Sequence, residues 1–276
     1  MKPRYESWTG ERLETFITGE TMFEHLHRYA IALSLAEGQK VLDIACGEGY
    51  GAALLSKKAS SVTGIDISSK AIETARKKYK NSNLRFETGD ILNIPSEDAS
   101  FTMITCFETI EHVEDHHKLL KELRRVLTSD GILLLSTPEM ETGNKNAKYI
   151  NPFHIRELTG ESFKELVLSY FPNCHFYKQN SFACSFIESD TSSSPDQWYT
   201  GNYVNINKLP PPTAKYWLAI ASNGQNHENI SGFFLPEQSL TELIHEESEA
   251  VRMTGSYKLG RFLTAPWRML LSLFGH

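Results

Sequence analysis

The stretch VLDIACGEGYGA, residues 41–52, decides the fold. A short apolar run ends in a turn with three glycines at alternate positions, Gly47, Gly49 and Gly51, where a helix is expected to begin. A Gly-x-Gly turn after a strand lets the backbone approach a ligand at the carboxyl end of a sheet. The spacing is not the Gly-x-Gly-x-x-Gly that prepares a helix N-terminus for a pyrophosphate, and Glu48 would lie where that anion belongs. The stretch predicts a strand-turn-helix unit that does not bind a dinucleotide.

The chain around this stretch, residues 40–138, alternates strand and helix patterns. Residues 115–127 place five leucine and valine side chains on one helical stripe, with Lys and Arg outside it. Such alternation predicts parallel strands covered by helices on both faces. We therefore expect an α/β, Rossmann-like doubly wound fold with a mainly parallel seven-stranded sheet, an antiparallel late strand near residues 215–223, an N-terminal helix and a C-terminal amphipathic tail. The apolar runs are 40–46, 61–67, 84–90, 101–107 and 131–138.

The composition of the 276 residues is that of an ordinary globular protein, with 40% hydrophobic and 22% charged residues. A net charge of -6 argues against nucleic-acid binding, which usually shows a basic face. The four cysteines have no CxxC spacing and indicate reduced thiols. Residues 1–16 lack the apolar region of a signal peptide, and no run reaches the ~18 apolar residues of a spanning helix. We expect a cytoplasmic protein.

Acidic residues end three predicted strands. Asp66 follows Asp43 by 23 residues, near the separation at which a carboxylate binds ribose hydroxyls, and Asp90 is placed to read the amino edge of adenine. Each alone could be a helix cap or a solvated turn, but three at successive strand ends favour one site. A nucleoside bound by carboxylates without phosphates suits S-adenosylmethionine, whose sulfonium and ammonium groups favour an acidic cleft.

These motifs closely resemble those of the class I S-adenosylmethionine-dependent methyltransferases over about residues 36–140. VLDIACGEGYG is similar to their first motif, GIDIS to the acidic end of the second strand and GDI to the adenine motif. The resemblance implies that Gly47 and Gly49 pass under the methionine part, that Asp66 holds the ribose and that Asp90 frames the adenine. The predicted donor site also includes Arg28, Asp43, Ala45, Cys46, Ile67, Ile91, Cys106 and Phe107.

Two flanking stretches, residues 24–33 and 151–158, resemble bacterial methyltransferases associated with O-antigen and polysaccharide synthesis and, less closely, quinone O-methyltransferases. In the first, Arg28 is placed to pair with the cofactor carboxylate. Alternatively, this helix only packs on the sheet and its polar residues are exposed. In the second, His154 is either an acid or base at the acceptor side or a structural histidine.

The acidic stretch ETIEHVED, residues 108–115, follows the fourth predicted strand. Asp115 is predicted as the N-cap of the next helix. Glu108, Glu111 and His112 resemble a quinone O-methyltransferase arrangement that holds a divalent cation, and this oxygen-rich set would suit Mg²⁺ or Mn²⁺. His112 is predicted first as general base, with Glu111 and His154 as further catalytic residues. The alternative is an acidic loop without chemistry.

Three regions are expected. Residues 1–35 form a cofactor-covering segment, 36–224 a methyltransferase domain with a lid-like insertion at about 188–214, and 225–276 a helical tail. The insertion carries Trp198, Tyr199 and Tyr203, which either stack on an acceptor or pack against the core. The basic amphipathic end, 257–276, either lies on a membrane surface or packs on this domain or a second subunit.

The function predicted from these features is methyl transfer from S-adenosylmethionine to a sugar hydroxyl in bacterial surface polysaccharide or glycan biosynthesis. The acceptor would be a glycan, a nucleotide sugar or another small molecule, and the tail would allow peripheral contact with the inner membrane. A quinone or phenol O-methyltransferase is one alternative. A nucleoside-binding partner without catalysis is another.

Overall fold

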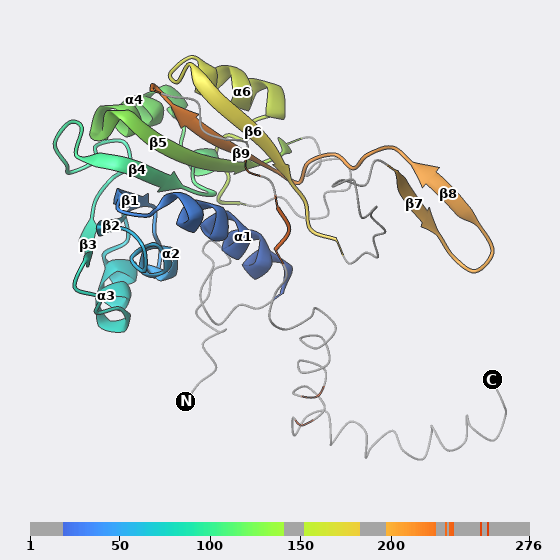
Figure 1. The fold of residues 1–276 in the computed structure, drawn as a ribbon, viewed down its shortest axis with the longest axis horizontal. Coiled ribbons are helices and arrows are strands. Elements are labelled where there is room, and N and C mark those ends of the chain that lie inside the picture. Colours follow the sequence, from blue (N-terminus) through green and yellow to red (C-terminus); the bar gives the residue numbers. More distant parts are fainter. Residues whose placement is uncertain are drawn as a thin grey trace.

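A seven-stranded sheet organises the computed structural model, which describes residues 19–140, 152–182, 197–224, 230, 232–234, 249 and 253 (Figure 1). The strand order is β3-β2-β1-β4-β5-β9-β6. β1 pairs in parallel with β2 and β4, and β9 runs antiparallel between β5 and β6. This confirms the predicted fold class and the antiparallel late strand. The strands are β1 (Lys40–Ile44), β2 (Ser61–Asp66), β3 (Leu84–Thr88), β4 (Phe101–Cys106), β5 (Leu127–Pro138), β6 (Asn173–Gln179) and β9 (Tyr216–Ser222).

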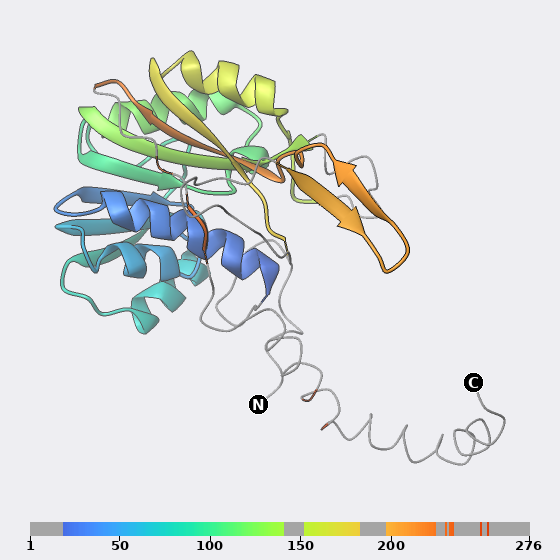
Figure 2. The same ribbon diagram turned by 45° about the vertical axis from the view of Figure 1, so that its right-hand side comes forward.

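Helices cover both faces of the sheet, as Figures 1 and 2 show. α1 (Glu20–Leu35), α2 (Tyr50–Leu55) and α3 (Ser69–Lys78) lie on one face, and α4 (His116–Val126) and α6 (Gly160–Leu168) lie on the other. Each face has its own buried apolar cluster: Tyr29 and Leu55 belong to the first, and Leu123 and Phe163 to the second. This is the doubly wound arrangement, which leaves the carboxyl ends of the parallel strands at one edge.

The start of α4 shows how local sequence sets an element. Asp115 accepts a hydrogen bond from the Lys118 backbone N-H at 2.9 Å, which satisfies one unpaired donor of the first turn. Leu119, Leu120 and Leu123 then face the sheet and are fully buried. The predicted N-cap role of Asp115 is confirmed.

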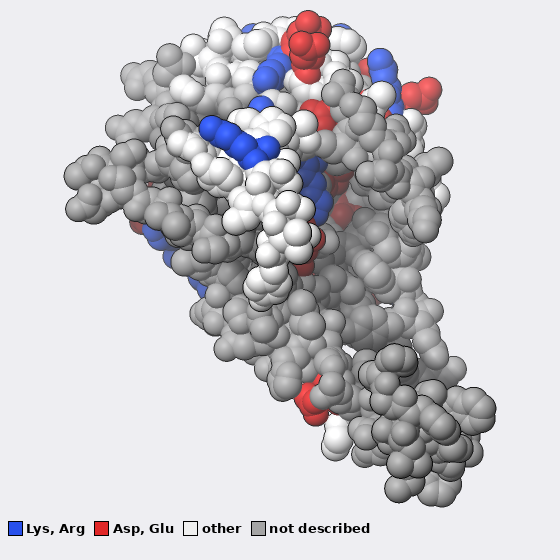
Figure 3. Space-filling model, turned by 90° about the vertical axis from the view of Figure 1, so that its right-hand side faces the viewer, with Lys and Arg blue, Asp and Glu red and all other residues white. Residues whose placement is uncertain are grey.

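The segment predicted as a lid-like insertion contains a hairpin. β7 (Trp198–Gly201) pairs antiparallel with β8 (Ile206–Leu209), and the hairpin projects from the body of the protein (Figures 1 and 2). Tyr199 is 60% exposed and Tyr203 fully exposed, so these rings do not pack against the core. Figure 3 looks onto this side, where uncharged side chains cover most of the hairpin surface. Residues 197–214 contain no Asp or Glu.

Some predicted regions fall outside the described residues. These are residues 1–18, 183–196 and nearly all of the tail from 225 onward, including the amphipathic end at 257–276. Among the helices of the described part, none is long and apolar enough to cross a membrane.

Candidate functional site

The glycine loop connects β1 to α2 with a left-handed backbone. Gly47 and Gly49 have φ angles of 54° and 81°. A Cβ on Gly49 would lie 2.5 Å from the Phe86 ring, so close packing excludes a side chain there. A Cβ on Gly47 would have no atom within 4 Å, which leaves open space above the loop at the carboxyl edge of the sheet. Glycine is therefore needed at position 49 because Phe86 packs against it, whereas Gly47 leaves room for a ligand.

Asp66, the last residue of β2, is 3% exposed and ties the glycine loop to its own strand end. Its Oδ2 accepts from the Gly47 N-H at 2.9 Å and its Oδ1 from the Ser68 N-H at 2.8 Å. These two hydrogen bonds fix the carboxylate beside the glycine loop. Ile67, next to it, is 68% exposed and provides an apolar face.

Asp90 lies beyond the end of β3, the strand next to β2. Its side chain is exposed, and its Oδ1 accepts from the Leu92 N-H at 2.8 Å in a turn that includes Ile91. Parallel strands bring their carboxyl ends to the same edge, so Asp66 and Asp90 lie along one margin of the sheet. The sequence-predicted ribose and adenine residues are therefore neighbours in the fold.

Asp43 has a different environment, because it is 1% exposed and held by two hydroxyls. It accepts from Thr105 Oγ1 of β4 at 2.6 Å and from Tyr29 Oη of α1 at 3.0 Å. Burial raises the pKa of Asp43 from 3.8 to about 6. Asp43 thus joins α1 to two central strands.

The raised pKa of Asp43 predicts that stability falls as pH rises. The folded state favours the protonated carboxyl. The stabilising contribution of Asp43 to the free energy of unfolding is therefore complete below pH 3.8 and is lost as pH rises through about 6. Asp43→Asn keeps an acceptor oxygen for both hydroxyls and removes the titration. We expect wild type to lose about 3 kcal/mol of unfolding free energy between about pH 4 and pH 7 relative to this variant. Urea unfolding at both pH values measures it, and parallel pH profiles would contradict the assignment.

Three other predicted donor-site side chains are buried. Cys46, Cys106 and Phe107 are at most 8% exposed and belong to the two apolar clusters. Burial raises the pKa of both thiols, which keeps them protonated. Their side chains pack the core, as does the edge-on contact between Phe107 and Tyr29 at 5.1 Å. Ala45 has a φ of 57° and carries the chain from β1 into the glycine loop.

Arg28 of α1 is only 1% exposed, so the alternative in which the polar residues of this helix are merely exposed is wrong for this side chain. Its Nη1 lies 3.2 Å from Glu108 Oε1, and its Nε donates to Gln179 Oε1 at 2.7 Å. Its guanidinium carbon lies 4.4 Å from the centre of the Tyr216 ring. Within the described part, Nη2 makes no hydrogen bond and Nη1 is engaged only in the ion pair with Glu108, so Nη2 is a donor that suits a ligand carboxylate.

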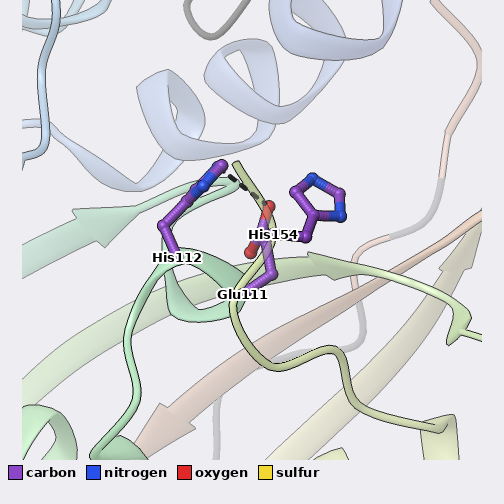
Figure 4. Close-up of side chains that lie close together, drawn as sticks. All are labelled: Glu111, His112 and His154. Carbon is purple, nitrogen blue, oxygen red and sulfur yellow. Dashed lines mark ion pairs between the residues drawn. The ribbon is translucent and has the colours of Figure 1, made fainter. Parts of the chain in front are cut away.

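Glu111, His112 and His154 come together after β4 and β5 (Figure 4). One ligand atom from each lies within 4.8 Å of the other two. The two imidazoles meet edge-on with ring centres 5.1 Å apart. Glu111 Oε1 lies 3.9 Å from His112 Nε2. The segment carrying His154 is held here because the N-H groups of Ile155 and Arg156 donate to the Glu111 carbonyl.

Hydrogen bonds set the orientation of both imidazoles. His112 Nδ1 lies 2.8 Å from the Phe153 carbonyl oxygen, which can only accept, so Nδ1 carries the proton. His154 Nδ1 lies 2.6 Å from Glu157 Oε1, which orients this ring through a carboxylate. In neutral His112 the Nε2 therefore carries the lone pair, as proton acceptance or metal binding requires. Burial, reinforced by the charge of Glu108, raises the pKa of Glu111 well above its usual range.

Comparison with known proteins gives the family of the central region. Residues 42–135 match the family described as "Methyltransferase domain". These residues are therefore similar to a methyltransferase domain. A Mycolicibacterium smegmatis protein named "Probable S-adenosylmethionine-dependent methyltransferase" is 33% identical over 162 residues, covering 58% of this chain and 62% of the relative. A "Ubiquinone biosynthesis O-methyltransferase" of Actinobacillus pleuropneumoniae is 34% identical over 110 residues, covering 36% and 46%. The chain thus spans less than two thirds of these relatives.

The fold described above recurs in solved structures. The crystal structure of a Pyrococcus horikoshii protein aligns with a TM-score of 0.57 at 21% identity, covering 79% of this chain and 97% of that one. The family implies S-adenosylmethionine as cofactor. The open space above Gly47, the Asp66 carboxylate bonded to the Gly47 N-H and the buried guanidinium of Arg28 fit that molecule.

Among the described residues, the predicted metal ligands Glu108, Glu111 and His112 are not grouped as one ligand set. Glu108 is ion-paired with Arg28 and accepts from Ser136 Oγ at 2.7 Å, while His154 lies beside Glu111 and His112. Sequence reasoning also did not foresee the hydrogen bonds that Glu157, Tyr29 and Thr105 make. Only Glu157 carried a local signal, because it follows His154 by three positions. The other contacts join different elements and have no signature in spacing.

Proposed function

We propose that this chain is an S-adenosylmethionine-dependent O-methyltransferase whose acceptor is a sugar hydroxyl of a bacterial surface glycan. The observation that carries the oxygen acceptor is the Glu111–His112–His154 cluster. Its oriented imidazoles follow β4, which lies beside β1 and its glycine loop, and β5, the next strand of the sheet. Methyl transfer to a hydroxyl needs a proton acceptor as well as a methyl donor, and the domain offers residues for both.

The donor would be held by residues of the strand ends and of α1. Asp66 would bind the ribose hydroxyls, Asp90 with Ile91 would frame the adenine, and Arg28 would receive the carboxylate of the methionine part. Methyl transfer from a sulfonium is an in-line displacement, so the protein mainly positions donor and acceptor. His112 Nε2 would accept the hydroxyl proton in the metal-free protein, since Nδ1 is committed to the Phe153 carbonyl.

A sugar acceptor is supported by two features. Residues 24–33 and 151–158 resemble polysaccharide-associated methyltransferases, and the hairpin exposes Tyr199 and Tyr203, whose ring faces suit stacking on sugars. Contact of residues 257–276 with a membrane would suit a lipid-linked glycan and remains a prediction. A second candidate is a quinone or phenol acceptor, favoured by the relative named "Ubiquinone biosynthesis O-methyltransferase".

Product analysis with methyl-labelled S-adenosylmethionine tests the acceptor. We expect label on glycan precursors with free hydroxyls and little on catechols or hydroquinones, because the exposed aromatic hairpin suits a sugar ring. Label on phenols alone would replace the sugar by the second candidate. Cofactor binding without turnover on any acceptor, where a partner enzyme requires this chain, would favour a non-catalytic role.

A further inference from the structure

The Glu111–His112–His154 cluster has a donor set that differs from the one predicted from residues 108–112. It offers one carboxylate oxygen and two imidazole nitrogens, all within 4.8 Å of one another (Figure 4). Ligands about 2.1 Å from one ion lie roughly 3–3.5 Å apart. Side-chain rotations that move the ligand atoms by about 1 Å would bring these three atoms to coordination distance.

The hydrogen bonds around the cluster match those of metal-binding histidines. Such histidines almost always donate their second ring N-H to a carbonyl or a carboxylate, which fixes the tautomer and the ring orientation. His112 has a carbonyl partner, Phe153, and His154 has a carboxylate partner, Glu157. Both arrangements direct Nε2 away from the supporting partner.

The Glu111 carboxylate supplies an independent observation. Glu111 is 1% exposed, and its Oε2 has no hydrogen-bond partner in the described part of the chain. A buried carboxylate oxygen without a partner is costly, because burial removes its water. The carboxylate lies between the two imidazoles in Figure 4, so a cation held there would compensate this cost.

We propose that Glu111, His112 and His154 form a binding site for a divalent transition-metal ion such as Zn²⁺, Fe²⁺ or Mn²⁺. Two imidazoles and one carboxylate leave open positions for water or an acceptor oxygen, and this set suits borderline metals better than Mg²⁺. Glu108 lies outside the site because Arg28 and Ser136 hold its carboxylate.

The role of the ion rests on the proposed function, whereas its binding does not. A bound ion would polarise an acceptor hydroxyl and lower its pKa, so His112 would act as a ligand in the metal-bound form. The open coordination positions would also orient the acceptor oxygen. Metal binding is measured without cofactor or acceptor, so failure of methyl transfer leaves this inference intact.

Titration of the metal-free, tag-free protein with Co²⁺, followed by visible absorption, tests the site. We expect one Co²⁺ per chain, with bands that millimolar Mg²⁺ does not remove. His154→Ala and Glu111→Gln should each weaken binding by more than tenfold. Glu157→Gln, which preserves shape, should weaken it by about 10–100-fold through loss of the carboxylate partner.

His117→Ala provides the matched control, because His117 is an exposed histidine of α4 that bonds Tyr170 away from the cluster. It should bind Co²⁺ as wild type does. Absence of stoichiometric binding in wild type would overturn the inference, and so would equal binding by His154→Ala. Weaker binding in Glu108→Gln with unchanged binding in His154→Ala would place the ion on the acidic stretch and overturn the assignment of His154.

Discussion

Replacement of His112 by alanine is expected to lower kcat by about 10²–10⁴-fold while S-adenosylmethionine binds with unchanged affinity. The imidazole lies beside Glu111 and His154, which are not among the residues proposed to hold the donor, and its Nδ1 is bonded to the Phe153 carbonyl. Loss of Nε2 removes either the proton acceptor or one ligand of the ion. Single-turnover rates with labelled donor and calorimetric donor binding measure the two effects separately.

The control for this result is again His117→Ala, which removes an imidazole of α4 outside the cluster. It should retain wild-type kcat. Full turnover in His112→Ala, with donor binding intact, would remove His112 from the reaction. A parallel loss of donor affinity would instead indicate damage to the glycine loop.

Replacement of Gly49 by alanine is expected to lower the free energy of unfolding by about 2–5 kcal/mol. Two costs combine, because φ is 81° and the new Cβ would lie 2.5 Å from the Phe86 ring. Displacing Phe86 disturbs β3 and the face packed by α3. Equilibrium unfolding in urea measures the effect.

Gly47→Ala separates the two costs. Gly47 also has a left-handed φ, 54°, but a Cβ there would have no atom within 4 Å. We expect only about 1–2 kcal/mol of backbone strain, together with weaker donor binding because the methyl group fills the open space. Equal destabilisation by both variants would show that packing against Phe86 contributes nothing.

Elements with a local signature were predictable. The apolar runs of β1, β2, β4 and β5 are short and buried on both faces, so hydrophobicity alone marks them. β6 was missed as an individual strand because it lies at the sheet edge and its residues are only partly buried. The hairpin was predicted only as a loop, since its exposed strands bury no apolar face that would mark them.

In the candidate site, too, the residues with a local sequence signature were predictable and those placed by contacts between separate elements were not. Gly47, Asp66 and Asp90 lie at or just beyond the ends of β1, β2 and β3, and parallel pairing brings them to one edge without further information. The structure differs from the prediction in the partners of the charged residues. Glu108 is ion-paired with Arg28 of α1, and His154 replaces it beside Glu111. Which carboxylate reaches which cation depends on where α1 and the segment after β5 lie, and spacing within residues 108–115 carries no such information.

The sequence by itself determined the parallel sheet, the glycine loop, the acidic strand ends and the cap at Asp115, because each depends on residues that are neighbours along the chain or on the common direction of parallel strands. Only the tertiary structure decided that Asp43 is buried under Tyr29, that Arg28 holds Glu108 and that His154 meets His112. These contacts join separate elements, and their geometry arises when helices and loops pack on the sheet.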